Sequence, residues 1–276
     1  MRIMKRHGSS KLRRFTGANV LGTLLLLAVA RGAALEPTPA ADAGFNNYIV
    51  ALESRLVQEH LSSDGFLAAS RDPQSKERLR KGELVVEQLT PDGGASLPGA
   101  LLHDWRGTAF VPGATAADFE RLMKDFNDYP QSFSPEVLKA KVTMQDGDQL
   151  LASMRVRQQH IVTVVMDMSY DIQYGHLDAQ HGYSASRSTQ IAEIDDAGTS
   201  DERVLDGSQE HGFLWRQNTY WTYEERDGGL GIQIETVTLT RSIPTGLGWI
   251  VGPFIESIPR DSLEFILRCA ANALKR

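Results

Sequence analysis

The alternation of hydrophobic and polar residues is most regular in the middle of the chain. Between residues 162 and 174 every second side chain is apolar or aromatic, and the side chains between them are mostly polar. This period of two is typical of a β-strand with one face in the core and the other in water. The apolar face consists of Val162, Val164, Met166, Met168, Tyr170, Ile172 and Tyr174.

Several other segments are predicted to be strands of the same antiparallel sheet. Turn residues at Gly147 and Gly228 join two of the pairs as hairpins. Near the end of the sheet the apolar positions change parity, from Ile232 and Ile234 to a later pair that includes Leu239, which predicts a β-bulge or strong coiling. The further predicted strands are residues 82–89, 101–111, 137–144, 150–158, 183–193, 207–225 and 230–243.

The chain also carries helical patterns before, within and after the strands. Residues 45–61 and 73–80 have helical spacing, and Thr115 with Asp118 forms a capping box that starts a helix. The C-terminal run from residue 246 has a broad apolar face suited to lying across a sheet. Two prolines, Pro253 and Pro259, predict that this run bends or breaks and becomes regular only after the second one.

The first 34 residues differ from the rest of the chain. Basic residues precede a short apolar run at residues 18–30, and small residues follow it. This order predicts an export signal, and an uncleaved N-terminal anchor is the alternative. We therefore expect an exported protein, periplasmic or secreted, with a linker and helical segment at residues 35–81 and the main domain at residues 82–276.

Composition narrows the possible functions. The hydrophobic fraction of 41% and charged fraction of 23% are ordinary for a globular protein, and the net charge of −6 argues against a nucleic-acid partner. The single cysteine, Cys269, lies in the C-terminal apolar run and excludes an intrachain disulfide. The common hydrolase, nucleotide-binding and zinc motifs are absent from the sequence, so we expect no cofactor and favour a non-enzymatic role.

Histidines at or near predicted strand ends are the only candidates for a metal site. They are His160, His176, His181 and His211. Because no cysteine partners or fixed ligand spacing accompany them, ordinary strand-end histidines are the preferred interpretation, and we expect no bound metal.

The order of strand, helix, antiparallel meander and long C-terminal helix resembles the START-like superfamily, which includes polyketide cyclases. The segments that carry the resemblance are residues 103–115 with their following helix, the strands from Val137, and residues 242–267. The resemblance covers roughly residues 84–274, and exported bacterial members are the most similar. It implies an α+β helix-grip fold, in which a curved antiparallel sheet wraps around the C-terminal helix and leaves a cavity for a hydrophobic ligand.

Candidate ligand-binding residues lie on the late strands. Arg216, Asn218 and Tyr220 share one parity, and Glu235 is on the partner strand. Pointing into the cavity, they would form the few polar groups that orient a mostly apolar ligand. Facing outward, Arg216 and Glu235 would form a surface ion pair that contributes little.

Three further residues complete the predicted binding set. Arg187 shares the parity of an apolar strand face and would need a carboxylate partner, for which Asp167 and Asp171 are candidates. Trp249 and Phe254 come from the apolar face of the C-terminal helix.

These patterns predict a protein that binds a lipid or other hydrophobic small molecule in the cell envelope, with transfer of that molecule as an extension of the role. Uptake would require the C-terminal helix or the loop at residues 125–135 to move, and the aromatic residues of that loop could touch a membrane transiently. One alternative is a cyclase-like or aromatase-like enzyme that uses Arg216, Tyr220, Glu235 and Asp167 in the same cavity. Another is a non-catalytic structural envelope protein.

Overall fold

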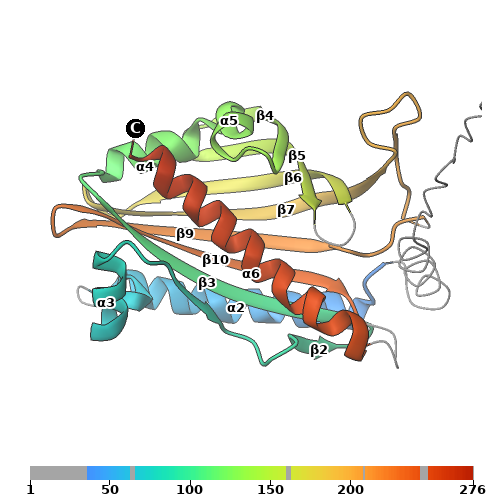
Figure 1. Cartoon of the computed structure of the whole chain (residues 1–276), viewed down its shortest axis with the longest axis horizontal. Coiled ribbons are helices and arrows are strands. Elements are labelled where there is room, and N and C mark those ends of the chain that lie inside the picture. The colour runs from blue at the N-terminus through green and yellow to red at the C-terminus, as the bar shows by residue number, and fades with distance from the viewer. Residues whose placement is uncertain (1–35, 63–65, 160–162, 208, 243–247, 276) are drawn as a thin grey trace, which may run out of the picture. The chain divides into compact units, whose positions relative to one another are not determined.

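One antiparallel sheet organises the protein, seen here in a computed structural model (Figure 1). The structure describes residues 36–62, 66–159, 163–207, 209–242 and 248–275, and for residues 248–256 it describes the backbone alone. The helices are α2 (Pro39–His60), η1 (Ala68–Arg71), α3 (Pro73–Arg80), α4 (Ala116–Lys124), η2 (Phe126–Asp128), α5 (Tyr129–Ser132) and α6 (Gly248–Ala273). The strands are β1 (Val85–Gln88), β2 (Ala95–Leu97), β3 (Ala100–Pro112), β4 (Val137–Asp146), β5 (Gln149–Gln159), β6 (Thr163–His176), β7 (His181–Asp195), β8 (Arg203–Val204), β9 (Arg216–Arg226) and β10 (Gly229–Arg241).

The sheet is open, with β1 and β4 at its edges. Its order is β1-β3-β10-β9-β7-β6-β5-β4, with β2 added to β3 and β8 added to β7. Helix α6 crosses one face of this curved sheet, as Figure 1 shows. This is the predicted α+β helix-grip architecture, and the C-terminal helix is the element that the sheet holds.

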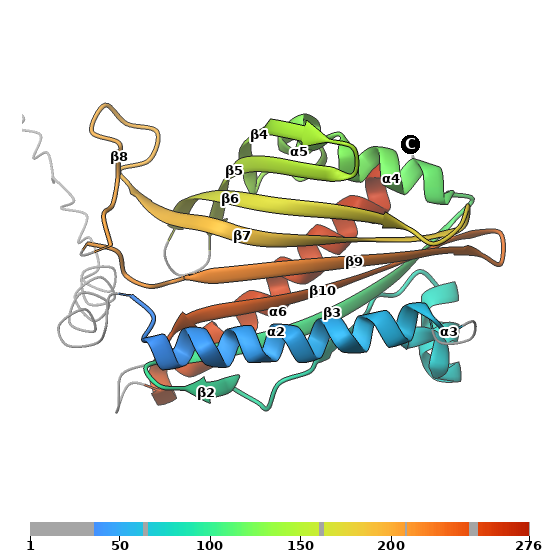
Figure 2. The same cartoon turned by 180° about the vertical axis from the view of Figure 1, so that it is seen from behind.

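The second face of the central strands is covered by α2 (Figure 2). Phe45, Leu52 and Leu56 of α2 pack with Val237 and Leu239 in one buried cluster. A separate cluster on the α6 side contains Leu263 and Leu267 of α6 with Ile232 and Ile234 of β10. The central strands are therefore buried on both faces, and the N-terminal helix supplies one of the two covers.

Two-sided burial explains why the predicted bulge in the last strand is wrong. Strand β10 pairs without interruption from Gly229 to Arg241 with both β3 and β9. Ile232 and Ile234 face α6, whereas Val237 and Leu239 face α2. The apolar residues change parity because α6 buries one face of the strand at Ile232 and Ile234, and α2 buries the opposite face at Val237 and Leu239. The backbone pairing stays regular along the whole strand.

The predicted interruption of the C-terminal helix is also wrong. Helix α6 runs from Gly248 to Ala273 and includes both Pro253 and Pro259. A proline inside a helix removes one backbone donor, which bends a helix without ending it when packing holds the turns on each side. Such packing is visible in the later turns, where Leu263 and Leu267 are fully buried against the sheet.

A close approach of α6 to β3 depends on one glycine. A Cβ atom added at Gly107 would overlap the Leu263 side chain and lie 3.1 Å from Cδ2 of Leu267. Gly107 therefore lets the helix lie directly on the strand.

Helices α2 and α4 begin at residues whose side chains cap the first turn. Thr115 caps α4 through the predicted capping box with Asp118. Helix α2 begins earlier than its hydrophobic spacing indicates, because the Thr38 side chain accepts a hydrogen bond from the Ala41 amide and Pro39 occupies the first turn. Within the described ranges, none of the helices has the length and apolar character that a membrane span requires.

Candidate ligand-binding cavity

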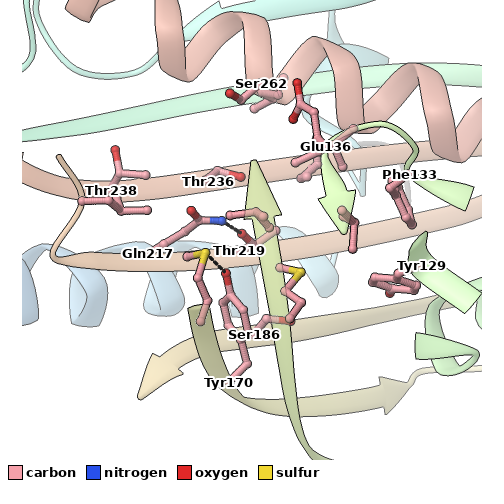
Figure 3. Close-up of a pocket in the computed structure, with 18 of the residues that line it drawn as sticks. Tyr129, Phe133, Glu136, Tyr170, Ser186, Gln217, Thr219, Thr236, Thr238 and Ser262 are labelled. Atoms are coloured by element: carbon pink, nitrogen blue, oxygen red, sulfur yellow. Dashed lines mark hydrogen bonds between the residues drawn. The ribbon is translucent and has the colours of Figure 1, made fainter. Parts of the chain in front are cut away.

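A cavity of about 180 Å³ lies between the sheet, α6 and the short helices η2 and α5 (Figure 3). Most of its wall is apolar. The β5 and β6 side chains that line it include Met154, Met166, Met168, Tyr170 and Ile172. The alternating face predicted for β6 is confirmed as the inner wall of this cavity.

An aromatic cluster closes the end of the cavity near α5, and it consists of Phe126, Tyr129 and Phe133. The ring centroid of Tyr129 lies 4.4 Å from that of Phe126 and 4.7 Å from that of Phe133. The Tyr129 hydroxyl donates to the Met123 carbonyl at 3.0 Å, and the Tyr174 hydroxyl donates to the same carbonyl at 2.7 Å. The polar tips of both tyrosines are thus occupied, so their rings face the cavity as apolar surface.

A row of hydroxyl groups crosses the floor of the cavity on three neighbouring strands. Ser186 on β7 is the register partner of Thr219 on β9, which is the partner of Thr236 on β10. Gln217 and Thr238 form the next pair along the strands. The hydroxyl oxygens of Thr236 and Thr238 are buried and have no hydrogen-bond partner among the described residues. This hydroxyl row (Ser186, Thr219, Thr236 and Thr238), together with the Gln217 amide beside it, can therefore satisfy polar groups of a bound molecule.

One carboxyl group, that of Glu136, lines the cavity. Its backbone amide donates to the Phe133 carbonyl at 3.2 Å and its carbonyl accepts from the Arg157 amide at 2.7 Å, so the residue is fixed at the start of β4. The side chain is half-buried, and burial raises the pKa of its carboxyl to about 7. Nearby, Gln158 donates to the Ser262 hydroxyl at 3.1 Å and so ties β5 to α6 at the cavity wall.

Five of the predicted ligand-binding residues face α2 and do not line the cavity. They are Arg187, Arg216, Asn218, Tyr220 and Glu235. Their shared parity is as predicted, but the prediction that this parity points into the cavity is wrong. The strand pattern alone does not show which face receives α2 and which receives α6.

Three of these residues contact two acidic side chains of α2, and a fourth, Asn218, contacts one of the three. Arg187 and Tyr220 both donate to Glu53, at 2.6 and 2.8 Å, and Asn218 donates to the Tyr220 hydroxyl at 3.2 Å. Arg216 lies 3.4 Å from Asp42. The outward orientation is therefore present, but Arg216 and Glu235 have separate partners and do not form a surface pair.

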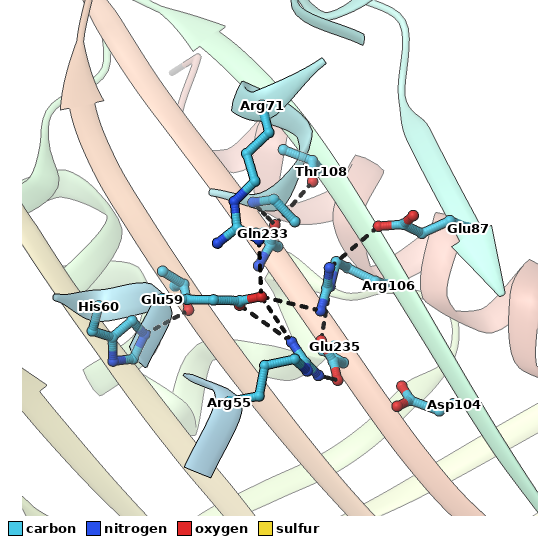
Figure 4. Close-up of polar contacts among 12 residues, drawn as sticks. Arg55, Glu59, His60, Arg71, Glu87, Asp104, Arg106, Thr108, Gln233 and Glu235 are labelled. Carbon is cyan, nitrogen blue, oxygen red and sulfur yellow. Dashed lines mark hydrogen bonds and ion pairs between the residues drawn. The ribbon is translucent and has the colours of Figure 1, made fainter. Parts of the chain in front are cut away.

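Glu235 belongs to a buried charged cluster beneath α2, which Figure 4 shows. Its carboxylate is 1% exposed and accepts from Arg106 Nε at 2.8 Å and from Arg55 of α2. Glu59 of α2 also bonds Arg55, at 3.2 Å. Buried carboxylates need such partners, so this cluster fixes α2 on the sheet.

Asp104 lies beside this cluster and accepts a hydrogen bond from the Tyr48 hydroxyl of α2 at 2.7 Å. Burial raises the pKa of Asp104 to about 8, and the negative charge of Glu235 adds to the shift. The carboxyl of Asp104 is therefore largely protonated at neutral pH.

The other predicted residues lie elsewhere. Trp249 and Phe254 belong to the first part of α6, where the side chains are outside the described residues. Asp167 faces away from the cavity and pairs with Arg155 at 2.6 Å. The four side chains that a cyclase-like reaction was predicted to use are therefore not among the residues that line the cavity.

Of the four histidines predicted as metal-ligand candidates, the three that the structure describes pair with carboxylates. His176 lies 3.2 Å from Glu120, His181 lies 2.8 Å from Asp178, and His211 lies 2.7 Å from Glu193. His160 is outside the described residues. In the described part of the chain, no three histidine, cysteine or acidic side chains are grouped to hold a metal ion.

The sequence interpretation missed the hydroxyl row and Glu136. A signal for the row was present, because Thr236, Thr238 and Thr240 repeat at every second position of the last strand, a pattern expected for a polar strand face. Glu136 follows Pro135 in a loop, and nothing in the local pattern indicates that it faces a cavity.

Solved structures with this fold are similar to the chain. A START superfamily protein from Mycobacterium smegmatis has 13% identity and a TM-score of 0.41, covering 62% of this chain and 97% of that protein. A STAR-related lipid transfer protein from Xanthomonas axonopodis has 15% identity and a TM-score of 0.40, covering 67% and 98%. The Zhui aromatase/cyclase from Streptomyces sp. R1128 has 11% identity and a TM-score of 0.46, covering 63% and 94%.

A START superfamily protein and an aromatase/cyclase are thus among the similar structures. No protein-family model matches the chain. No curated protein matches it either.

Proposed function

We propose that the protein binds a lipid or other hydrophobic small molecule in the cavity beneath α6. The observation that carries the proposal is the composition of the wall, which is mainly apolar and holds a compact hydroxyl row with two unpartnered buried oxygens in the described residues. A binding site of this kind gains affinity from apolar burial, at about 25 cal/mol per Å². Its few polar groups then set the orientation of the ligand.

The cavity volume limits the ligand that fits without rearrangement. At about 180 Å³ the cavity is slightly larger than the roughly 150 Å³ engineered cavity that accepts benzene. A ring-sized molecule or a segment of a longer chain fits the present volume. A complete lipid requires α6 or the segment from η2 to α5 to move outward, and this movement is our proposed route of uptake and release.

We propose that binding takes place outside the cytoplasm. The support is the basic leader and short apolar run in the first 34 residues. Transfer would require the segment from η2 to α5 to open, which would expose the apolar rings of Phe126, Tyr129 and Phe133 to a membrane surface.

Native mass spectrometry of protein purified from its own cells, followed by organic extraction, tests the proposal. We expect a co-purifying hydrophobic molecule in stoichiometric amount. The variant Ser186→Phe places a bulky side chain in the cavity and should lose this molecule. The matched control Thr189→Phe adds the same side chain at an exposed position of the same strand and should retain it.

An unoccupied protein under gentle conditions, with no uptake of added fatty acids or phospholipids, would contradict binding. Equal ligand content in the two variants would show that the molecule is bound outside this cavity.

A further inference from the structure

Glu136 has an unusual position for a carboxylate. Among the described residues that line the cavity, it is the only one of the types Asp, Glu, Lys, Arg and His. It lies three residues after Phe133, a member of the aromatic cluster, and its backbone is bonded to that residue. Figure 3 shows the Glu136 side chain directed toward α6 on the side of Ser262, apart from the rings of Tyr129 and Phe133. The cavity therefore has one carboxyl near α6 and a neutral hydroxyl row on its sheet floor.

No cation of the described chain neutralises this carboxyl. The nearest basic residue along β5, Arg157, directs its guanidinium to the Pro135 carbonyl at 3.3 Å. On α6, Cys269 is the titratable group that senses Glu136, because burial and the neighbouring negative charge raise the pKa of its thiol. Burial alone accounts for the raised pKa of Glu136, with no contribution from a neighbouring charge. The ionised carboxylate is thus uncompensated within the described residues.

We propose that the ligand of this cavity carries a basic amino group, which binds to the Glu136 carboxylate at the α6 side of the cavity. The proposal rests on the proposed function and specifies the chemical class of its ligand. The apolar body of such a molecule lies against β5 and β6, and any hydroxyl or carbonyl group on it reaches the hydroxyl row.

Two physical effects favour an ammonium group at this position. A hydrogen bond between two charged partners is roughly twice as strong as a neutral one. Glu136 is half-buried, so an ammonium bound to it keeps part of its hydration and avoids the full cost of burying a charge.

Binding of an amine should depend on pH. Below pH 7 the Glu136 carboxyl is mostly protonated, and above pH 7 it is mostly ionised. A primary amine stays cationic over this range, so its affinity should rise as the carboxyl ionises. An uncharged ligand of the same shape should gain nothing from this ionisation.

The test compares naphthylmethylamine with naphthylmethanol, which share one ring system and differ in the amino and hydroxyl groups. Calorimetric titration of the full chain at pH 6 and pH 8 gives the dissociation constants. For the unaltered protein at pH 8 we expect the amine to bind about tenfold more tightly than the alcohol. In Glu136→Gln the amine should bind no more tightly than the alcohol, at pH 6 and at pH 8.

Glu77→Gln serves as the matched control, because Glu77 is exposed on α3 and does not line the cavity. Alcohol binding without a preference for the amine, or an amine preference that survives Glu136→Gln, would overturn the inference and leave the proposed function intact. Failure of both probes to bind the unaltered protein, together with a ligand-free native mass, would overturn the proposed function itself.

Discussion

Asp104 shows how strongly one buried position controls the charge of a side chain. It is 1% exposed, and only one of its carboxylate oxygens has a hydrogen-bond partner in the described chain, the Tyr48 hydroxyl. Its pKa of about 8 is far above the ordinary value of about 4. At pH values between these two pKa values, Asp104 is protonated in the native protein and ionised in the unfolded chain. The free energy of unfolding therefore falls as the pH rises through this range.

The substitution Asp104→Asn should remove this pH dependence. The amide oxygen can still accept from Tyr48, and the side chain has no proton to lose. From pH 5 to pH 8 we expect the stability of the unaltered protein to fall by about 1–3 kcal/mol relative to the variant. Urea denaturation at the two pH values measures the difference.

Asp92→Asn is the matched control for this experiment, since Asp92 is exposed in the turn before β2. Parallel stability curves for the unaltered protein and Asp104→Asn would show that Asp104 is ionised in the native state at neutral pH.

At the residue scale, the sequence predicts the buried face of a strand correctly where the other face is exposed to solvent. Met166, Met168 and Tyr170 alternate with polar residues and share one buried face as predicted, and the structure places that face on the cavity. This kind of prediction fails on β9 and β10, where both faces are buried and the sequence carries two overlapping patterns. Arg216 and Glu235 were assigned correctly to one face of the sheet, but the α2 side chains that neutralise them lie about 180 residues earlier in the chain.

At the scale of elements, α2 is attached to the sheet through both apolar and charged contacts. The charged contacts centre on Arg106 of β3, which is 8% exposed at its side chain and bonds the fully buried Glu235. Removing one partner of a buried ion pair leaves the other charge unpaired in the interior.

Arg106→Ala should therefore lower the free energy of unfolding by about 3 kcal/mol. Arg80→Ala removes an exposed arginine that lies 3.5 Å from Asp227, and it should change stability by less than about 0.5 kcal/mol. Equal effects of the two substitutions, measured by urea denaturation, would show that the cluster beneath α2 contributes no more than a surface pair.

The contact of α6 with β3 gives a second prediction at this scale. Gly107→Ala places a methyl group where Leu263 packs, and overpacking of this kind costs about 1–3 kcal/mol. In the Leu263→Ala background the methyl group has room, so the same substitution should cost clearly less. Denaturation of the four proteins of this double-mutant cycle measures the coupling between strand and helix. Strict additivity would mean that α6 does not rest on Gly107.

The element boundaries could be predicted where caps are local. The capping box of Thr115 and Asp118 marks the start of α4 in the sequence and in the structure. The continuity of α6 through Pro253 and Pro259 could not be predicted in this way, because the backbone preference of proline opposes it. The sequence predicts a bend or break at the prolines and a regular helix only after Pro259, whereas packing against the sheet favours one continuous helix.

At the scale of the whole molecule, the central strands are enclosed between α2 and α6. The N-terminal helical segment is therefore part of the core and not an addition to it, since Leu102, Val237 and Leu239 are each at most 1% exposed beneath α2. The sequence divided the chain at residue 82 because the resemblance to the START-like superfamily begins there.

Deletion of residues 36–81 should expose this apolar face and the carboxylate of Glu235. We expect a chain that begins at residue 82 to aggregate or to lose cooperative unfolding, whereas a chain that begins at residue 36 stays folded. Size-exclusion chromatography and urea denaturation of both chains test this. A folded monomer from the shorter chain would support the domain boundary predicted from the sequence.

The unequal covering of the sheet constrains how this protein can diversify. On β9 and β10, successive residues face the cavity and α2 alternately, so substitutions on these strands must be compatible with packing on both faces. On β4, outward residues such as Lys139, Lys141 and Thr143 are exposed and serve neither. The β4 side of the sheet can therefore accept insertions and altered side chains at little cost to folding. Relatives with other ligands should differ most along this edge, while the strands beneath α2 keep their sequence.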